Sequence, residues 1–455
     1  MSQSSKRNNQ GYNTAFKSTA LFGGTQIFTI IISVVKSKFV ALWLGTFGVG
    51  IMGLFTTAIN LIANATNLGL QSSAVREIAN CNEDKKKLSY VVFSLNRWVV
   101  VTGLLGMVIT MLLSPWLSEI YFDNTEYTIS FILLSVIVLL SGLQNQYSAI
   151  LQGTRNLSLM IKSSIYGAVL AFLLSVPFFY IWGVNGIVPS LIVNAIASFL
   201  LVRYFFRKTD IPPIQQTYKE SFYMGISAVK LGISMSLATF VGILIEFIVR
   251  AYISRSSCVE EVGLYSAAWA LETQYLGLVF TAMSKDYYPR LSQVSNDNKK
   301  IGSMMNEQGE MALLLLAPLI TIMIVCIKLV VLILYSDSFI TCAPLVKWLL
   351  VGSFIKAGSW GISFIFLAKS SSKVYLINEL LIRAVMLPLY LWGYKLGGLE
   401  GVGYAYVITQ IFYFVWVLGT CYRTYRIKYG CIFWKLFFSF CLLYTSPSPR
   451  DPKTS

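Results

Sequence analysis

Two stretches about 210 residues apart decide the fold of this chain: PFFYIWG at residues 177–183 and PLYLWG at residues 388–393. Each stretch closes an apolar segment and leads through glycines into the next one. A second pair, GLF at residues 53–55 and GLY at residues 263–265, recurs at a similar distance. The chain is therefore predicted to contain two similar halves.

The apolar segments are long enough to cross a membrane. Hydrophobic residues make up 56% of the chain and charged residues 12%, and the mean hydropathy is +0.65. About twenty mostly apolar residues span the hydrocarbon layer as a helix. We therefore expect an all-α polytopic membrane protein with about twelve transmembrane helices. The predicted segments are 19–43, 49–70, 91–113, 127–150, 163–183, 185–204, 223–253, 264–284, 308–334, 341–368, 375–393 and 400–421.

The repeat predicts how these helices are grouped. With six segments in each half, both halves begin on the same side of the membrane, as in transporters built from parallel repeats. We expect one six-helix lobe over residues 1–215 and a second over residues 216–430, with alternating access between them. Residues 431–455 are expected to be a truncated apolar segment followed by a non-native tail that resembles vector sequence.

Lysine and arginine predict the orientation, because loops rich in these residues tend to remain in the cytoplasm. Both termini are therefore expected to be cytoplasmic. The net charge of +16 follows from this topology and does not indicate binding to nucleic acid, because no separate domain carries it. The basic residues in alternate connections are Lys6, Arg7, Lys17, Arg76, Lys85, Lys86, Lys87, Arg155, Lys162, Arg203, Arg207, Lys208, Lys219, Lys285, Arg290, Lys299, Lys300, Lys369 and Lys373.

This orientation makes a testable prediction. In a background without cysteine, a single cysteine at Asn124 should react with an impermeant reagent in intact cells. A cysteine at Lys86 should react only after the membrane is permeabilised, because its loop is basic. The reverse labelling pattern would invert the topology.

Catalytic and metal-binding patterns are absent from the sequence. The chain has no histidine, which removes His-based metal sites and His-based acid–base catalysis. All connections are short, and none holds paired carboxylates, a nucleotide-binding loop or a nucleophile with a base. We therefore predict a transport protein without cofactors or metal ions. A membrane enzyme of polysaccharide assembly is the disfavoured alternative.

Ionisable residues inside apolar segments are costly in lipid and usually line cavities or form pairs. The basic ones outnumber the acidic ones, which favours an anionic cargo. Four of them, Lys36, Arg250, Lys356 and Arg383, are the candidates for binding an anionic head group. An alternative for Arg250 is a structural pair with Glu246, which lies four residues before it.

Polar and aromatic stripes suggest contacts with sugar. Asn60, Asn64 and Asn67 share one face of their helix, and hydrogen bonding between helices explains them equally well. Trp269 and Trp360 lie on helix faces that also carry a charged residue. These five residues are the candidates for sugar contact.

Any ion coupling must use a carboxylate, since histidine is absent. Glu272 and Glu246 are the candidates. Glu272 has no base three or four residues away, whereas Glu246 is followed by Arg250 at that spacing. Glu272 could instead pair with a base on another helix, such as Lys356.

Five short motifs, in this order and spacing, resemble the Wzx-type O-antigen and capsular polysaccharide flippases. This family belongs to the superfamily that also contains multidrug extruders and lipid II flippases. The motifs are LGTFGVGIMGLF at residues 44–55, SAVRE at 73–77, LQG at 151–153, WGVNG at 182–186 and YPRL at 288–291.

The resemblance implies a function. The expected activity is movement of undecaprenyl-diphosphate-linked oligosaccharide across the bacterial inner membrane, with H⁺ or Na⁺ as the candidate counter-ion. Implied partners are the lipid-linked substrate, membrane lipids and other polysaccharide-assembly proteins. A multidrug or cation antiporter of the same superfamily is the alternative, and the excess of basic in-span residues argues against it.

Overall fold

The computed structural model describes residues 2–81, 84–209, 211–212, 218–369 and 371–445. Side chains are described for Thr25 and from Phe28 onward, except at scattered positions. The basic side chains of Lys6, Arg7 and Lys17 lie outside this set, as do residues 446–455 of the predicted non-native tail. The described backbone is almost entirely helical and contains no strand, so the predicted all-α class is confirmed.

The chain divides into two compact units, Met1–Gly263 and Leu264–Ser455. This division lies later than the lobe boundary expected from the repeat, between residues 215 and 216. The first unit includes the helix after that boundary because this helix packs against helices near the amino terminus. The division into two six-helix lobes, inferred from the repeat, therefore remains a prediction.

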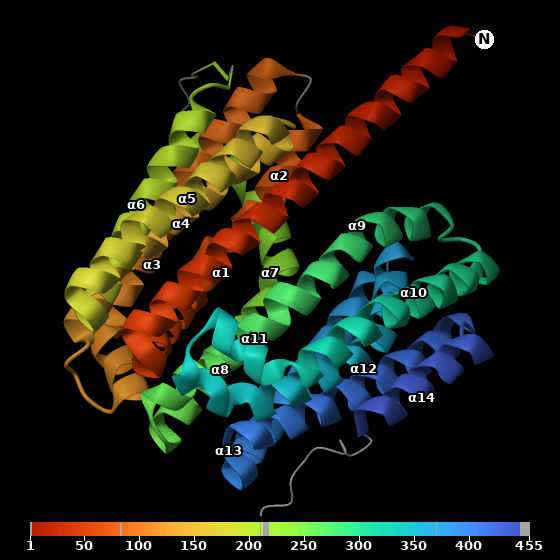
Figure 1. The fold of residues 1–455 in the computed structure, drawn as a ribbon. Coiled ribbons are helices and arrows are strands. Elements are labelled where there is room, and N and C mark those ends of the chain that lie inside the picture. The colour runs from red at the N-terminus through yellow and green to blue at the C-terminus, as the bar shows by residue number, and fades with distance from the viewer. Residues whose placement is uncertain (1, 82–83, 210, 213–217, 370, 446–455) are drawn as a thin grey trace, which may run out of the picture. The chain divides into compact units, whose positions relative to one another are not determined.

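In the first unit, long helices pack side by side (Figure 1). Helix α7 packs against α1, α2 and α3. The buried faces of α2, α3, α4 and α7 form an apolar cluster that includes Leu70, Ile78, Val92 and Ile150. The elements are α1 (Ser2–Asn67), α2 (Leu70–Asn80), α3 (Lys85–Phe122), α4 (Thr128–Gly153), α5 (Leu157–Trp182), η1 (Gly183–Gly186), α6 (Ile187–Phe206) and α7 (Tyr218–Ser256).

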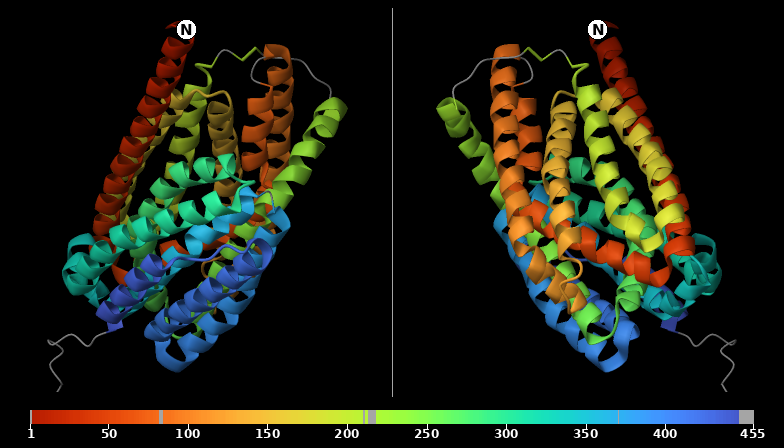
Figure 2. Two further views of the ribbon diagram at one scale, coloured as in Figure 1. Left: turned by 90° about the vertical axis from the view of Figure 1, so that its right-hand side faces the viewer. Right: turned by 90° about the vertical axis from the view of Figure 1, so that its left-hand side faces the viewer.

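In the second unit, α12 and α13 form the most extensive helix pair (Figure 2). Helix α8 (Val259–Leu271) contains the division between the units and leads into a π-helical turn, η2 (Glu272–Leu276). The remaining elements are α9 (Gly277–Gln293), α10 (Asn298–Val325), α11 (Ile327–Leu334), η3 (Asp337–Cys342), α12 (Ala343–Ala368), α13 (Ser372–Tyr425) and α14 (Cys431–Thr445).

Eight helical stretches are long and apolar enough to cross a membrane. Three of them are broken at glycines with positive φ and so contain two predicted segments each: Phe28–Asn67, Leu157–Phe206 and Lys373–Tyr425. The eight account for every predicted segment except 264–284, which is interrupted by η2. The structure is thus consistent with about twelve segments in a multi-pass membrane protein.

The helix starts and breaks repeat along the chain. Asp84 caps α3 by accepting hydrogen bonds from the backbone N–H groups of Lys86 and Lys87. Asp297 caps α10 in the same way, and its backbone has nearly the same extended conformation. Such caps satisfy donors that a helix start leaves unpaired. Each half also has a helix break at a glycine with positive φ: Gly183 separates α5 from α6, and Gly398 lies within α13. This agreement supports an internal repeat.

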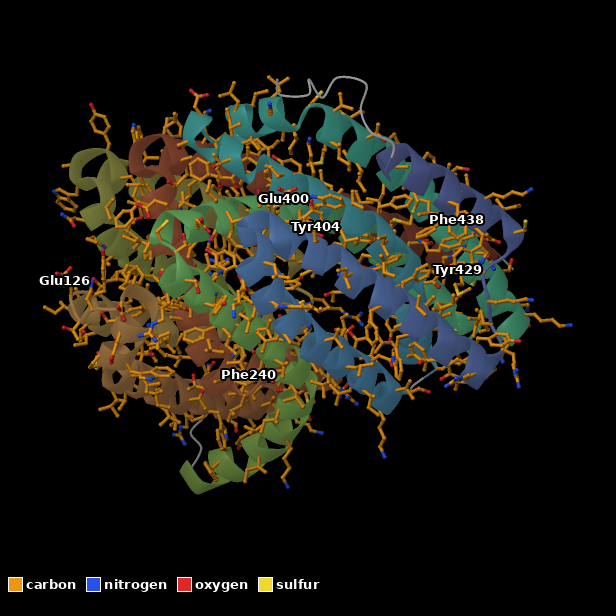
Figure 3. All side chains as sticks on the ribbon, turned by 90° about the horizontal axis from the view of Figure 1, so that it is seen from below. Glu126, Phe240, Glu400, Tyr404, Tyr429 and Phe438 are labelled. Atoms are coloured by element: carbon orange, nitrogen blue, oxygen red, sulfur yellow. The ribbon has the colours of Figure 1, made fainter. Side chains whose placement is uncertain are left out.

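The apolar segment after residue 430 is integrated into the second unit. The Tyr429 hydroxyl donates to the Gly358 carbonyl over 2.8 Å, and the Tyr429 ring stacks on Phe433. The Gly430 N–H donates to the Asn306 side chain. Helix α14 then packs against α10, and Tyr429 and Phe438 mark this aromatic region in Figure 3. Although short, the segment is therefore a part of the core of this unit.

Gly69 is placed where a side chain would not fit. It has a φ of +66°, and a Cβ atom there would overlap the carbonyl oxygen of Gly232 on α7. Gly398 also has a positive φ, +56°, but no heavy atom lies within 4 Å of the position of its Cβ. A side chain at Gly398 would therefore meet only backbone strain, whereas one at Gly69 would meet both backbone strain and a steric overlap.

We expect Gly69→Ala to lower the free energy of unfolding by about 2–5 kcal/mol, from the left-handed backbone and the overlap together. Gly398→Ala should cost only about 1–2 kcal/mol, because it meets open space. Thermal unfolding of both purified variants in detergent measures the difference. Equal losses would show that the contact between Gly69 and Gly232 is not tight.

Candidate functional site

The second unit contains a cavity of about 340 Å³ between α8, α12 and α13. Residues before and after the helix break at Gly397 and Gly398 both line it, so the two halves of α13 contribute to the same cavity. Charged, hydroxyl and aromatic side chains are mixed in its wall. The lining residues are Trp269, Lys356, Ser359, Trp360, Ser363, Phe364, Leu367, Tyr375, Glu379, Ile382, Arg383, Met386, Tyr406, Gln410 and Tyr413.

Two of the predicted cations, Lys356 and Arg383, line this cavity together. Lys356 Nζ lies 3.7 Å from Glu272 Oε1, and Arg383 Nη2 lies 4.0 Å from Glu379 Oε2. Both separations exceed the usual length of a charge-assisted hydrogen bond, about 2.7–2.9 Å. Each cation is thus neutralised nearby, while its N–H groups are not committed to these carboxylates.

The carboxylates obtain their hydrogen bonds from hydroxyl groups instead. Glu272 is 2% exposed and accepts from Ser353 Oγ over 2.6 Å and from the Tyr406 hydroxyl over 3.4 Å. Glu379 accepts from the Tyr413 hydroxyl over 3.0 Å. A buried carboxylate is costly unless it is paired and hydrogen-bonded, and both conditions hold for Glu272.

The local fold around Glu272 is unusual. Glu272 is the first residue of the π-helical turn η2. Such turns are rare and frequently occur at functional sites, because the extra residue turns a side chain to a new direction. The carboxylate of Glu272 here meets Ser353 and Lys356 on α12 and Tyr406 on α13. Lys356 is thus the base on another helix that the sequence left open as a partner for Glu272.

Aromatic side chains form part of the same wall. Trp269 packs edge-on against Tyr406, with ring centroids 5.2 Å apart. Trp360 packs against Phe280 and Phe364. Both tryptophans that the sequence suggested for sugar contact therefore lie beside the two cations.

The other predicted head-group residues belong to the first unit. Lys36 is half-buried on α1, and Arg250 is buried on α7. Arg250 Nη2 donates to Glu246 Oε1 over 2.6 Å, so the structural pair expected at this spacing is present. Neither cation is among the residues that line the cavities described for the first unit.

The three predicted asparagines line a separate cavity of about 150 Å³ in the first unit. Asn60, Asn64 and Asn67 face it from α1, together with residues from α2, α3, α4 and α7. The structure thus separates the predicted sugar-contact residues into an amide group in the first unit and a tryptophan group in the second.

Sequence reasoning missed Tyr406, Gln410 and Tyr413, which line the larger cavity from the second half of α13. Their spacing of four and three residues places them on one helix face, and this pattern could have identified them. Within the described part of the chain, no group of three or more His, Cys, Asp or Glu residues could hold a metal ion.

Comparisons with known proteins identify relatives of the chain. The model of the family described as Polysaccharide biosynthesis protein matches residues 43–344. The Lipid III flippase of Escherichia coli (strain K12) is 21% identical over 384 residues, which cover 83% of this chain and 91% of that protein.

Solved structures share the fold. An inward-facing multidrug resistance MATE family transporter of the MOP superfamily aligns with a TM-score of 0.65 and 15% identity, over 87% of this chain and 93% of the other. The Lipid II flippase MurJ, in an inward closed conformation, aligns with a TM-score of 0.64 and 14% identity, over 94% and 91%. The predicted MATE- and flippase-like fold is therefore confirmed.

Proposed function

Because the chain belongs to the polysaccharide biosynthesis protein family, we propose that it flips undecaprenyl-diphosphate-linked oligosaccharide from the cytoplasmic to the periplasmic leaflet of the bacterial inner membrane. Its relatives are flippases and transporters, and this chain is a membrane transport protein and not an enzyme. The O-antigen or capsular nature of the glycan and the cytoplasmic position of both termini are parts of the same proposal.

The observation that carries this proposal is the pair of cations in the cavity of the second unit. Lys356 and Arg383 line the same space, and their N–H groups are not bonded to the nearby carboxylates. A diphosphate offers several anionic oxygens to such donors. Arginine binds phosphate in a bidentate manner and lysine acts as a point charge, so the two complement each other.

The size and lining of the cavity suit a head group. Its volume of about 340 Å³ lies at the lower end of the range for ligand pockets, about 300–1,000 Å³. The diphosphate and the adjacent sugar would be held there, with Trp269 and Trp360 against the sugar ring. The polyprenyl tail would remain in lipid, and the site would open to each leaflet in turn.

Ion coupling is the second part of the proposal. Glu272 lies next to Lys356, so a change in the charge of Glu272 changes the attraction on a residue proposed to bind the substrate. A counter-ion, H⁺ or Na⁺, that neutralised Glu272 would therefore be linked to substrate binding. Glu246 is the weaker candidate because Arg250 neutralises it directly at 2.6 Å. Other polysaccharide-assembly proteins would supply and receive the glycan.

A cation antiporter is the alternative that one observation favours. Glu379 lines the cavity close to Trp360, Tyr375 and Tyr413, and aromatic rings with a carboxylate suit an organic cation. However, Glu379 accepts a hydrogen bond from Tyr413 and lies 4.0 Å from Arg383, which reduces its attraction for a cation.

Transport by the purified chain in vesicles separates the two functions. We expect movement of a fluorescent undecaprenyl-diphosphate disaccharide between leaflets, measured by chemical quenching of the outer leaflet. The monophosphate analogue should move more slowly, because it offers fewer oxygens to Lys356 and Arg383. Export of the cation ethidium without movement of the diphosphate lipid would replace the flippase proposal with the antiporter.

A further inference from the structure

The smaller cavity, in the first unit, is lined by an unusual number of amide side chains. Helices α1, α2, α3, α4 and α7 contribute to it. Besides the asparagines of α1, it includes Gln71 at the start of α2 and Asn145 on α4, which no sequence pattern had connected. The lining residues are Asn60, Ala63, Asn64, Thr66, Asn67, Gln71, Val99, Thr102, Gly103, Val138, Ser141, Gly142, Asn145 and Ile243.

The amides of this cavity are not used to hold the helices together. Asn60, Asn64, Asn67, Gln71 and Asn145 make no side-chain hydrogen bond with any other residue that the structure describes. Each amide offers two N–H donors and one acceptor oxygen. Interhelical hydrogen bonding, the alternative explanation for the asparagine stripe, is therefore not what these residues do among the described helices.

The hydroxyl groups in the wall behave differently. Thr66 Oγ1 donates to the Ile62 carbonyl within its own helix, and Ser141 Oγ donates to the Val138 carbonyl in the same manner. These hydroxyls have satisfied their donors and can only accept. The amides therefore supply the donors that remain for a molecule in the cavity. Because these side chains are half-buried or exposed, water satisfies them until a ligand replaces it.

The cavity is also electrically neutral. No Asp, Glu, Lys or Arg is among its lining residues, in contrast to the cavity of the second unit. A diphosphate or a drug cation would find no counter-charge there. An uncharged sugar matches the wall, because every sugar hydroxyl is both donor and acceptor, as an amide is. The apolar side chains of Val99, Val138 and Ile243 can cover the C–H face of the ring.

The volume of the cavity limits the ligand to one ring. In another protein, an apolar cavity of about 150 Å³ binds a single benzene molecule. The present cavity has the same volume, about 150 Å³, which is too small to enclose two six-membered rings. A bare metal ion would leave most of this space empty and would meet no carboxylate.

We propose that this amide-lined cavity binds one uncharged hexose unit of the transported glycan and thereby contributes to the choice of sugar. Gln71 and Asn145 are new binding residues, beside the three asparagines of α1. The inference rests on the proposed flippase function: the second unit is assigned the diphosphate and the sugar adjacent to it, and the first unit is assigned a further, uncharged sugar of the glycan.

Binding of free sugars to the full-length chain in detergent tests the proposal. The probes are millimolar glucose, galactose, N-acetylglucosamine and the anionic sugar glucuronate, detected by saturation-transfer NMR. We expect at least one neutral sugar to bind and glucuronate to bind more weakly. Asn64→Leu and Asn145→Leu should each weaken neutral-sugar binding about threefold to tenfold, the range for losing a neutral hydrogen bond.

Two further variants distinguish a loss of sugar binding from a loss of folding. Gly142→Ala adds a methyl group to the cavity wall, where its nearest neighbour, Val99, is at an ordinary contact distance of 3.6 Å. It should weaken sugar binding while the helices stay intact. Asn194→Leu is the matched control, because Asn194 bonds Ser175 and does not line the cavity. It should leave sugar binding unchanged.

Inorganic pyrophosphate, measured in the same samples, separates the two levels of the proposal. Pyrophosphate binding that is lost in Lys356→Gln, without any detectable sugar binding by the parent, overturns the sugar site and leaves the flippase proposal standing. Sugar binding that is lost in Trp360→Leu but not in Asn64→Leu also overturns it. A sodium ion that binds this cavity in place of sugar would do so as well.

Discussion

Lys356→Gln is expected to reduce transport of undecaprenyl-diphosphate disaccharide in vesicles about 10-fold to 100-fold. This range corresponds to losing a hydrogen bond between a charged donor and phosphate, about 1.5–3 kcal/mol. Arg383→Gln should have a similar effect, because both side chains line the same cavity. Lys356→Arg should be milder, since the charge is retained even though the geometry differs.

The position of the charge in the cavity, and not the net charge of the protein, should cause this loss. Lys347 lies on the same helix, α12, but is exposed and does not line the cavity. Lys347→Gln is therefore the matched control and should transport at the parental rate. Membrane abundance and thermal unfolding should be measured for each variant, so that a folding defect is recognised.

The same assay decides the roles of Lys36 and Arg250. The excess of basic in-span residues predicts that both bind the head group, whereas in the structure Arg250 pairs with Glu246. Loss of transport in Lys36→Gln and Arg250→Gln would add them to the binding site. Normal transport by both Lys356→Gln and Arg383→Gln would make the cationic-cavity proposal wrong, whatever the result for Lys36 and Arg250.

Glu272→Gln is expected to stop net flipping and to abolish the response to an imposed ion gradient. Glutamine mimics the protonated carboxyl, and so the side chain can no longer alternate between charge states. Glu272 is suited to this role because it is buried, bonded by Ser353 and next to Lys356 at 3.7 Å. The measurement is the transport rate in vesicles with and without a proton or sodium gradient.

Glu246→Gln is the control for this change. Glu246 pairs with Arg250 at 2.6 Å, and the substitution removes the carboxylate that faces this buried guanidinium, so it should mainly lower stability. Its transport should remain dependent on the gradient. An equal loss of gradient dependence in both variants would show that coupling is not specific to Glu272.

A purely structural role for Glu272 has a different signature. In that case the Glu272→Gln variant would unfold at a lower temperature but keep its gradient dependence. Adding Lys356→Gln would then restore the unfolding temperature, because the double variant no longer contains a lysine without its carboxylate partner. This combination of results would rule out coupling at Glu272.

Relations within one helix could be predicted from the sequence. The spacing of four residues predicts the pair of Glu246 with Arg250, and this pair is present at 2.6 Å. Glu379 and Arg383 have the same spacing and lie 4.0 Å apart. The glycine-containing motifs at residues 44–55 and 182–186 correspond to helix breaks at Gly45 and Gly183. Helical periodicity determines which residues share a face, and lipid requires long apolar helices with few charges. The membrane class and most of the apolar segments therefore followed directly from the sequence, whereas segment 264–284 is interrupted by η2.

Relations between helices were decided only by the tertiary structure. Periodicity specifies which side of a helix is polar, but not which other helix that side meets. The sequence thus left the partner of Glu272 open, and packing of α12 against η2 placed Lys356 beside it. For the same reason, the asparagines and tryptophans proposed for one sugar site lie in two cavities in different units. Amides from three helices and cations from two form binding sites only after the chain has folded.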